Sequence, residues 1–174
     1  IPLYGKACVS QKGYFLSDKT AEVIWAKEGF VLKGKSKSKW LAYYMGIRGA
    51  VFDAWVKQKM AEMPNAAIIH IGCGMDSRVL RVGTSHHKWY DIDFPVVIEE
   101  RKKYYTETEN YHMLSEDASK TEWIAALPKT ATPAAHEFIT TVYEKMMAAT
   151  SILKTSLQNG NPLIHPTVML CNLA

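Results

Sequence analysis

The sequence predicts an α/β protein with an open, doubly wound sheet. Three runs of strand character alternate with helical patterns between residues 66 and 127, which is the order expected of parallel strands joined by helices. The first run ends in "GCG" at residues 72–74. In open α/β folds a turn in this position lies at the carboxyl edge of the sheet, where ligands bind.

The composition is that of a globular protein. The chain has 174 residues, of which 48% are hydrophobic and 11% aromatic, so intrinsic disorder is not expected. The net charge of +4 leans basic, with four lysines alternating along residues 32–40. This run suits contact with phosphate or an acidic partner, but no aromatic residues interleave with the lysines. A solvated loop is therefore preferred, and no nucleic-acid partner is expected.

The cysteines bear on location and on metal binding. Their number is odd and they lack CxxC spacing, which argues against a disulfide framework and a zinc site: Cys8, Cys73 and Cys171. No apolar run approaches the roughly 20 residues that span a bilayer, and the start of the sequence lacks a signal-peptide pattern. We expect a cytoplasmic protein that has no metal and no membrane partner.

Two helices are expected before the first strand. Residues 17–30 open with a capping residue, have apolar positions at helical spacing and end at Gly29. Residues 40–63 form a longer helix, with an interruption considered near Gly46 and Gly49, and Pro64 ends it.

The sheet region follows. "AAIIHI", residues 66–71, is a continuous apolar run typical of a strand buried on both faces. Strands are also expected at residues 88–94 and 110–114. Helices are expected from Pro95, which suits a first helical turn, and over residues 121–127. Beyond Pro128 the pattern predicts a linker and a helix but no clear fourth strand.

Acidic residues follow the second and third strands. Asp91 and Asp93 end the second strand, about 20 residues after the glycines, the offset at which a carboxylate meets ribose hydroxyls in nucleotide-binding units. Asp117 follows the third strand and suits an adenine amino group. Singly, each aspartate is better explained as a turn or cap residue. Together with Gly72 and Gly74 they favour a nucleoside ligand.

The glycine turn narrows the choice of ligand. It lacks the third glycine of GxGxxG, since Ser77 stands there, and the sequence has no GxxxxGK[ST] phosphate cradle. A nucleoside cofactor without pyrophosphate, such as S-adenosylmethionine, fits better than NAD or ATP. Cys73 is interpreted as a small filler between the glycines and not as a nucleophile.

Several stretches together resemble the leucine carboxyl methyltransferase family, which includes bacterial S-adenosylmethionine-dependent O-methyltransferases. The stretches are "IIHIGCGMDSRVLRV", "WYDIDFPVVIEERKKYY" and "LSEDASKTEWIAAL", preceded by "IPLYGKACVS", "LSDKTAEVI" and "MGIRGAVFDAWVKQKM". The resemblance covers residues 1–128. It implies a Rossmann-like sheet of a class I methyltransferase, with an N-terminal helical cap at residues 1–63 and a cofactor-binding core at residues 64–128. Residues 129–174 are left as a helical tail of uncertain assignment.

The resemblance also implies roles for single residues. Gly72 and Gly74 would contact the methionine part of the cofactor, and Asp93 the ribose, with Asp91 a second acid. Asp117 would face the adenine. Arg48 would pair with the cofactor carboxylate, assisted by Lys6.

Other residues receive structural interpretations, and no catalytic residue is assigned. Arg78 is interpreted as a structural ion-pair partner. Tyr4, Trp40 and Tyr44 are candidates to cap an acceptor cavity, with core packing preferred for each. The expected acceptor is the carboxylate of a small molecule or of a protein C-terminus, or a hydroxyl oxygen.

The sequence departs from the family after Pro128. The expected fourth strand with its Glu-Gly pair is absent, so an incomplete copy of the fold is predicted. Residues 149–174 resemble the opening of the second domain of opine dehydrogenases, which would make His165 an acid or base. Two alternatives therefore remain open: an NAD(P)-dependent opine dehydrogenase or a fusion with part of one, and a non-catalytic binding domain.

Overall fold

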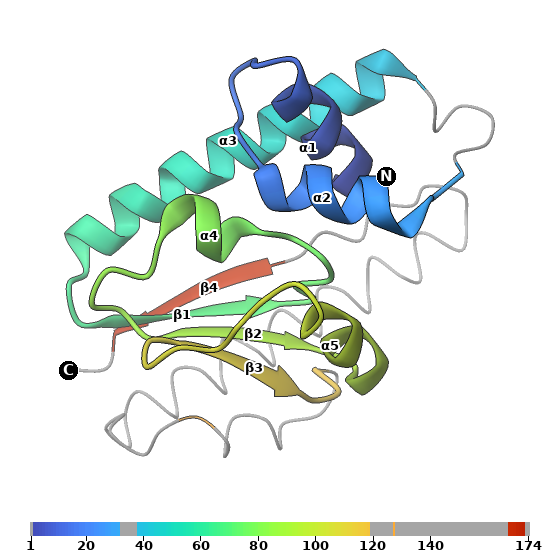
Figure 1. Ribbon diagram of the computed structural model, residues 1–174. Helices are drawn as coiled ribbons and strands as arrows, with labels where there is room; N and C mark the ends of the chain where they lie inside the picture. Colours follow the sequence, from blue (N-terminus) through green and yellow to red (C-terminus); the bar gives the residue numbers. More distant parts are fainter. Residues whose placement is uncertain (1, 32–37, 119–126, 128–166, 173–174) are drawn as a thin grey trace, which may run out of the picture.

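A computed structural model describes residues 2–31, 38–118, 127 and 167–172 of the chain (Figure 1). The helices and strands within these ranges are α1 (Pro2–Gln11), α2 (Lys19–Glu28), α3 (Lys39–Glu62), β1 (Ala66–Ile71), α4 (Arg78–Val82), β2 (Trp89–Asp93), α5 (Pro95–Arg101), β3 (Tyr111–Ser115) and β4 (Thr167–Asn172). Figure 1 shows α1, α2, α3 and α4 on one side of the sheet.

The four strands form one mixed sheet in the order β3-β2-β1-β4. The strands β1, β2 and β3 are parallel, as predicted, with Ile69 beside Tyr90 and Tyr90 beside His112. The strand β4 pairs with β1 in the antiparallel direction, Ala66 lying beside Asn172. The prediction of no further strand was wrong: the apolar end of the tail supplies one. Pairing with a strand distant in the sequence could not be read from local periodicity.

The predicted helices before the sheet are confirmed. Asp18 caps α2 by accepting a hydrogen bond from the Ala21 N–H at 2.9 Å. Gly29 ends α2 in the left-handed conformation, with φ of +59°.

The helix α3 is continuous, so the interruption considered near its two glycines does not occur. These glycines instead allow α1 to approach α3. A Cβ on Gly46 would lie 2.7 Å from a Val9 methyl, and one on Gly5 of α1 would lie 2.6 Å from Met45 Cβ. The absence of a side chain therefore serves close helix packing here.

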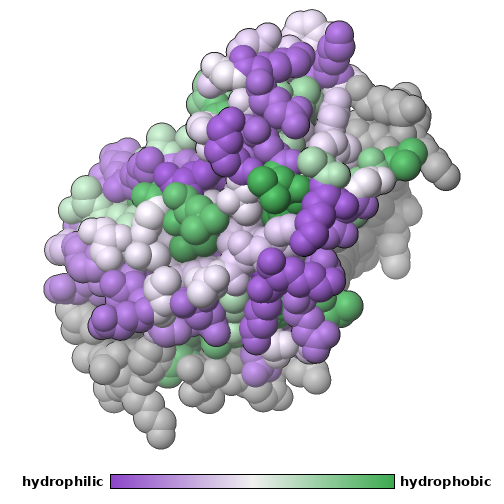
Figure 2. Space-filling model, viewed as in Figure 1, coloured by the Kyte–Doolittle hydropathy of each residue, from purple (hydrophilic) through white to green (hydrophobic). Residues whose placement is uncertain are grey.

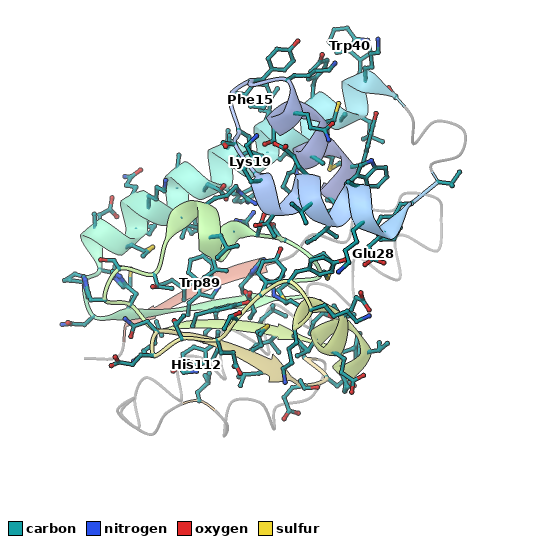
Figure 3. All side chains as sticks on the ribbon, in the orientation of Figure 1. Phe15, Lys19, Glu28, Trp40, Trp89 and His112 are labelled. Atoms are coloured by element: carbon teal, nitrogen blue, oxygen red, sulfur yellow. The ribbon has the colours of Figure 1, made fainter. Side chains whose placement is uncertain are left out.

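The helices and the sheet share one hydrophobic core. Ile24 of α2 and Val56 of α3 pack in the same cluster as Ile68 of β1 and Trp89 of β2, and all four are fully buried. Because side chains alternate along a strand, Trp89 and the neighbouring Tyr90 point to opposite faces. Figure 3 shows Trp89 on the helix side of the sheet and His112 on the other.

Some expectations fall on other parts of the chain or were wrong. The helix expected at 121–127, the tail helix and His165 lie outside the described residues, as do the lysines of residues 32–37. Core packing for Trp40 and Tyr44 was wrong, since they are 85% and 53% exposed. Within the described ranges, no helix is long and apolar enough to cross a bilayer.

Candidate functional site

The glycine turn follows β1 directly and lies at the carboxyl end of the parallel strands. Gly72 and Gly74 have φ of +66° and +51°, a conformation that costs other L-residues about 1–2 kcal/mol. The N–H groups of Gly72 and Cys73 donate to the Ile92 carbonyl at 2.8 and 3.3 Å, which fixes the turn against β2. A Cβ on either glycine would meet no atom within 4 Å. The two glycines thus adopt the left-handed backbone conformation that the turn requires, and they leave open space over the turn.

Asp93 closes the turn from the end of β2. Its Oδ2 accepts a hydrogen bond from the Gly74 N–H at 2.7 Å, and its Oδ1 accepts one from the Phe94 N–H at 2.8 Å. A carboxylate offers about four lone-pair sites, so each oxygen keeps the capacity to accept one more hydrogen bond. The side chain is only half-buried. Asp93 is therefore both a clamp on the turn and an available anionic acceptor.

The end of β3 lies beside Asp93. The Glu116 N–H donates to the Asp93 carbonyl at 3.0 Å, and the half-buried Asp117 is the next residue. The structure thus brings four of the predicted site residues, those of the turn and the two strand ends, to one edge of the sheet: Gly72, Gly74, Asp93 and Asp117.

Arg101 of α5 holds the turn from inside the protein. Its Nη1 donates to the Gly74 carbonyl at 2.8 Å, so both polar groups of Gly74 are fixed by side chains, Asp93 on one and Arg101 on the other. The guanidinium carbon lies 3.8 Å from the centre of the Tyr105 ring, whose hydroxyl donates to the Met75 carbonyl at 3.1 Å. Arg101 is fully buried. Sequence reasoning missed it because "EERKK" has the composition of a solvated helix face.

Asp91 is the counter-ion of Arg101 and lies inside the core. Its Oδ2 is paired with Arg101 and accepts from the Tyr111 hydroxyl at 2.8 Å. Its Oδ1 is 2.9 Å from both His70 Nδ1 and Trp89 Nε1. The residue has 0% exposure, and these four partners use its acceptor capacity. The structure therefore does not bring Asp91 to the open side of the turn, where the sequence interpretation placed it.

The protonation state of Asp91 follows from these contacts. Burial alone raises the pKa of its carboxyl, but the Arg101 guanidinium and the His70 hydrogen bond outweigh burial and hold the pKa below its ordinary value. Asp91 is thus ionised and keeps Arg101 in place. His70, a polar residue within an apolar strand, was the available sequence signal for this buried pair.

A second set of buried charges joins the N-terminal helices to the segment after the turn. We call it the six-charge cluster; it contains three cations and three anions: Lys6, Asp18, Asp53, Asp76, Arg78 and Arg81. Arg78 Nε donates to Asp53 at 2.9 Å, which confirms the structural ion pair predicted for Arg78. Arg81 lies within 2.6 Å of carboxylate oxygens of Asp18 and Asp53.

Lys6 belongs to this cluster. Its ammonium lies 2.6 Å from Asp76 Oδ1, and both side chains are more than nine-tenths buried. Burial alone raises the pKa of the Asp76 carboxyl, but Lys6 and the two arginines hold it well below its usual range. Lys6 thus neutralises a carboxylate two residues after Gly74 and is not brought to the open side of the turn.

The remaining predicted residue, Arg48, lies half-buried on α3. Its guanidinium carbon is 5.7 Å from the centre of the Tyr44 ring, and its Nη1 is 3.6 Å from Met45 Sδ. Cys73, between the two glycines, is 2% exposed, and burial raises the pKa of its thiol. This agrees with a packing role for Cys73. Among the residues that the structure describes, no group of three or more His, Cys, Asp or Glu side chains is placed to hold a metal ion.

Comparison with known proteins places this geometry in context. The family model for leucine carboxyl methyltransferase matches residues 4–142. The tetracenomycin polyketide synthesis O-methyltransferase TcmP of Streptomyces glaucescens is 32% identical over 83 residues, which are 47% of this chain and 31% of that protein. The chain thus spans less than a third of the length of that relative. No solved structure matches. The family match ends before His165.

Proposed function

Because the chain belongs to the leucine carboxyl methyltransferase family, we propose that it is an S-adenosylmethionine-dependent O-methyltransferase. The observation that carries the proposal is the glycine turn: two residues of positive φ with open space above them, clamped to a half-buried carboxylate. A backbone without side chains lets a ligand approach closely. The similarity to an O-methyltransferase of polyketide synthesis supports the same activity class.

The residues present fit S-adenosylmethionine. In our proposal the methionine part lies along the turn at Gly72 and Gly74, the ribose hydroxyls donate to the free acceptor sites of Asp93, and Asp117 accepts from the adenine amino group. Two hydrogen bonds to one carboxylate suit a cis-diol, and charge-assisted bonds are stronger than neutral ones. Arg48 remains our candidate for the cofactor carboxylate, on the family resemblance.

For Asp91 and Lys6 we propose positioning roles in place of cofactor contact. Asp91 fixes Arg101, which holds the Gly74 carbonyl. Lys6 fixes Asp76, close to the turn in the sequence. Buried charge pairs with complete hydrogen bonding favour one geometry of the groups they hold. Both residues would thus set the shape of the turn from behind.

The proposed methyl transfer requires no general acid or base from the protein when the acceptor is a carboxylate. When bound, the sulfonium supplies an activated methyl group for in-line displacement. Such a step depends on alignment and on exclusion of water. A carboxylate acceptor is already ionised at neutral pH, so it needs no general base. The contribution of this chain is to bind and orient, and no catalytic residue is assigned.

We also propose a more specific fold and a division of the chain into two parts. The parallel order β3-β2-β1 supports the Rossmann-like half of a class I methyltransferase, with residues 1–63 as helical cap and 64–128 as cofactor-binding core. We also propose a cytoplasmic location. The proposed acceptor is a carboxylate of a small molecule or of a protein C-terminus, or a hydroxyl oxygen.

Calorimetry and a transfer assay test the function. We expect S-adenosylhomocysteine to bind the chain with micromolar affinity and NADPH not to bind. A radiolabelled methyl group from S-adenosylmethionine should then appear on a panel of carboxylic acids or phenols. Binding without transfer to any acceptor would favour a non-catalytic binding domain. Absence of S-adenosylhomocysteine binding would contradict the proposal as a whole.

A further inference from the structure

The helix α3 presents a row of large apolar side chains to solvent. We call it the α3 row: Trp40 (85% exposed), Tyr44 (53%), Ile47 (48%), Val51 (61%) and Trp55 (41%). Successive members are four, three, four and four residues apart, so they share one face of the helix over about 22 Å. Figure 3 shows Trp40 projecting away from the molecule at the start of α3.

The opposite face of α3 is the one that joins the protein. The buried residues of this helix lie half a turn away from the α3 row: Ala42, Gly46, Gly49, Asp53, Val56 and Met60. The helix therefore has two apolar faces, of which one packs on α1 and the core. A helix that is apolar on both sides is expected where both sides are covered.

The exposed apolar residues on the face drawn in Figure 2 form no comparable row. On the face drawn in Figure 2, hydrophilic residues predominate and apolar ones form separate small areas over α2 and α4. Single exposed apolar residues are normal on protein surfaces, whereas contiguous ones mark interaction sites. Two tryptophans and a tyrosine in one row have the composition of an interface centre.

We propose that the α3 row is a homodimer interface in which two copies of α3 pack antiparallel about a two-fold axis. The 4-3-4-4 spacing averages 3.75 residues, close to the 3.6 residues of a helical turn, so the row runs nearly along the axis of α3. With the axis between residues 47 and 48, Trp40 lies opposite the partner's Trp55, and Tyr44 lies opposite the partner's Val51. Four of the five members thus meet members of the row in the partner, and Ile47 lies opposite the partner's Arg48. This reciprocal arrangement is what an isologous contact requires.

The area of the α3 row agrees with a second copy as the occupant. The five members of the α3 row are uncharged. The cation beside the axis, Arg48, is half-buried, and its guanidinium carbon lies 5.7 Å from the centre of the Tyr44 ring. If the partner covers them completely, the five members bury on the order of 600 Å² per protomer, taking the exposed fractions and about 150–250 Å² for each aromatic side chain. The total of about 1,200 Å² reaches the lower end of the range for specific interfaces.

Sedimentation equilibrium of the full chain tests the proposal. The chain mass is 19.6 kDa, and we expect twice that mass for the unmodified protein at tens of micromolar. Val51→Glu places a charge in the centre of the α3 row and should give the single-chain mass. The matched control is Val96→Glu, because Val96 of α5 is 73% exposed and lies outside the row; it should stay dimeric. Circular dichroism checks that both variants fold.

The direction of pairing is tested separately by cross-linking. Ile47→Cys places a thiol beside the proposed axis, so mild oxidation should link two chains through it, whereas Val96→Cys and the unmodified protein should not link. A single-chain mass for the unmodified protein would overturn the proposal. That result would hold even if a helix of another protein covers α3 in the cell. A Val51→Glu variant that stays dimeric would overturn it too. A dimer whose Ile47→Cys form does not cross-link would overturn the antiparallel arrangement.

Discussion

Alanine at Gly74 separates the role of the turn in folding from its role in binding. Gly74 has φ of +51° and no atom within 4 Å of an added Cβ, so the substitution costs only backbone strain, about 1–2 kcal/mol. For a chain of this size that lowers Tm by roughly 2–8 °C. The N–H and carbonyl of Gly74, which bond Asp93 and Arg101, remain available.

The same methyl group should have a larger effect on ligand binding. It would project into the space over the turn where we place the cofactor. Overlap of one methyl with a close-packed neighbour costs about 1–3 kcal/mol, which corresponds to a roughly 5- to 150-fold higher Kd. Calorimetry with S-adenosylhomocysteine measures this change, and differential scanning calorimetry measures the change in Tm.

Gly29 provides the matched control. It ends α2 with φ of +59° and also has no atom within 4 Å of an added Cβ, and it belongs to a different element from the turn. Gly29→Ala should lower Tm by a similar amount and leave Kd unchanged. If Gly74→Ala bound S-adenosylhomocysteine as tightly as Gly29→Ala, the cofactor would not lie against the turn and the reasoning would be refuted.

Three further predictions concern the buried groups. Arg101→Met leaves the Asp91 carboxylate buried without its cation, so urea titration should show a loss of about 3–5 kcal/mol; a loss under 1 kcal/mol would contradict the pairing. Burial alone raises the pKa of the Asp76 and Asp91 carboxyls. The nearby cations outweigh burial, so both pKa values are lower than usual. A depressed carboxyl pKa stabilises the fold above the unfolded value of about 3.9, and this stabilisation is lost as pH falls further. The urea concentration at the midpoint of unfolding should therefore be lower at pH 3 than at pH 5. An unchanged midpoint would argue against ionised carboxylates. Burial raises the pKa of the Cys73 thiol, so peptide mapping after iodoacetamide treatment of the native protein should find Cys73 unmodified, and rapid modification would show that it is accessible.

The parallel part of the fold could be predicted because its signals are local. The run of residues 66–71 has the length and composition of a buried strand, and Gly29, Pro64 and Pro95 mark helix boundaries through their own backbone preferences. The strand β4 could not be predicted in the same way. Its partner β1 lies almost 100 residues earlier in the chain, and no periodicity within residues 167–172 encodes that pairing.

The residues of the candidate site at the strand ends could be predicted from the sequence, but the buried residues behind them could not. Gly72, Gly74, Asp93 and Asp117 follow strand ends, and the geometry of a parallel sheet brings strand ends together. Asp91 and Asp93 differ by two positions and so point to the same face of the sheet, which gave no reason to treat them differently. Their difference comes from depth, since Arg101 reaches Asp91 from α5. Such a contact depends on tertiary packing.

The exposed face of α3 also could not be predicted from the sequence. Trp40 and Tyr44 are residue types common in protein cores, and a hydrophobic pattern alone does not distinguish a buried face from an exposed one. Only the exposed fractions, 85% and 53%, make the distinction. The buried residues of α3 lie on the opposite face of the helix.

The central claim is that the side-chain-free turn and Asp93 form one pocket for an adenosyl group. A crystal structure of the chain with S-adenosylhomocysteine tests it most directly. We expect density for the nucleoside over residues 72–74, with both ribose hydroxyls within 3.2 Å of the Asp93 carboxylate, a hydrogen-bond limit of about that length being usual. Density at another place, or an Asp93 side chain turned away from the ligand, would contradict the account.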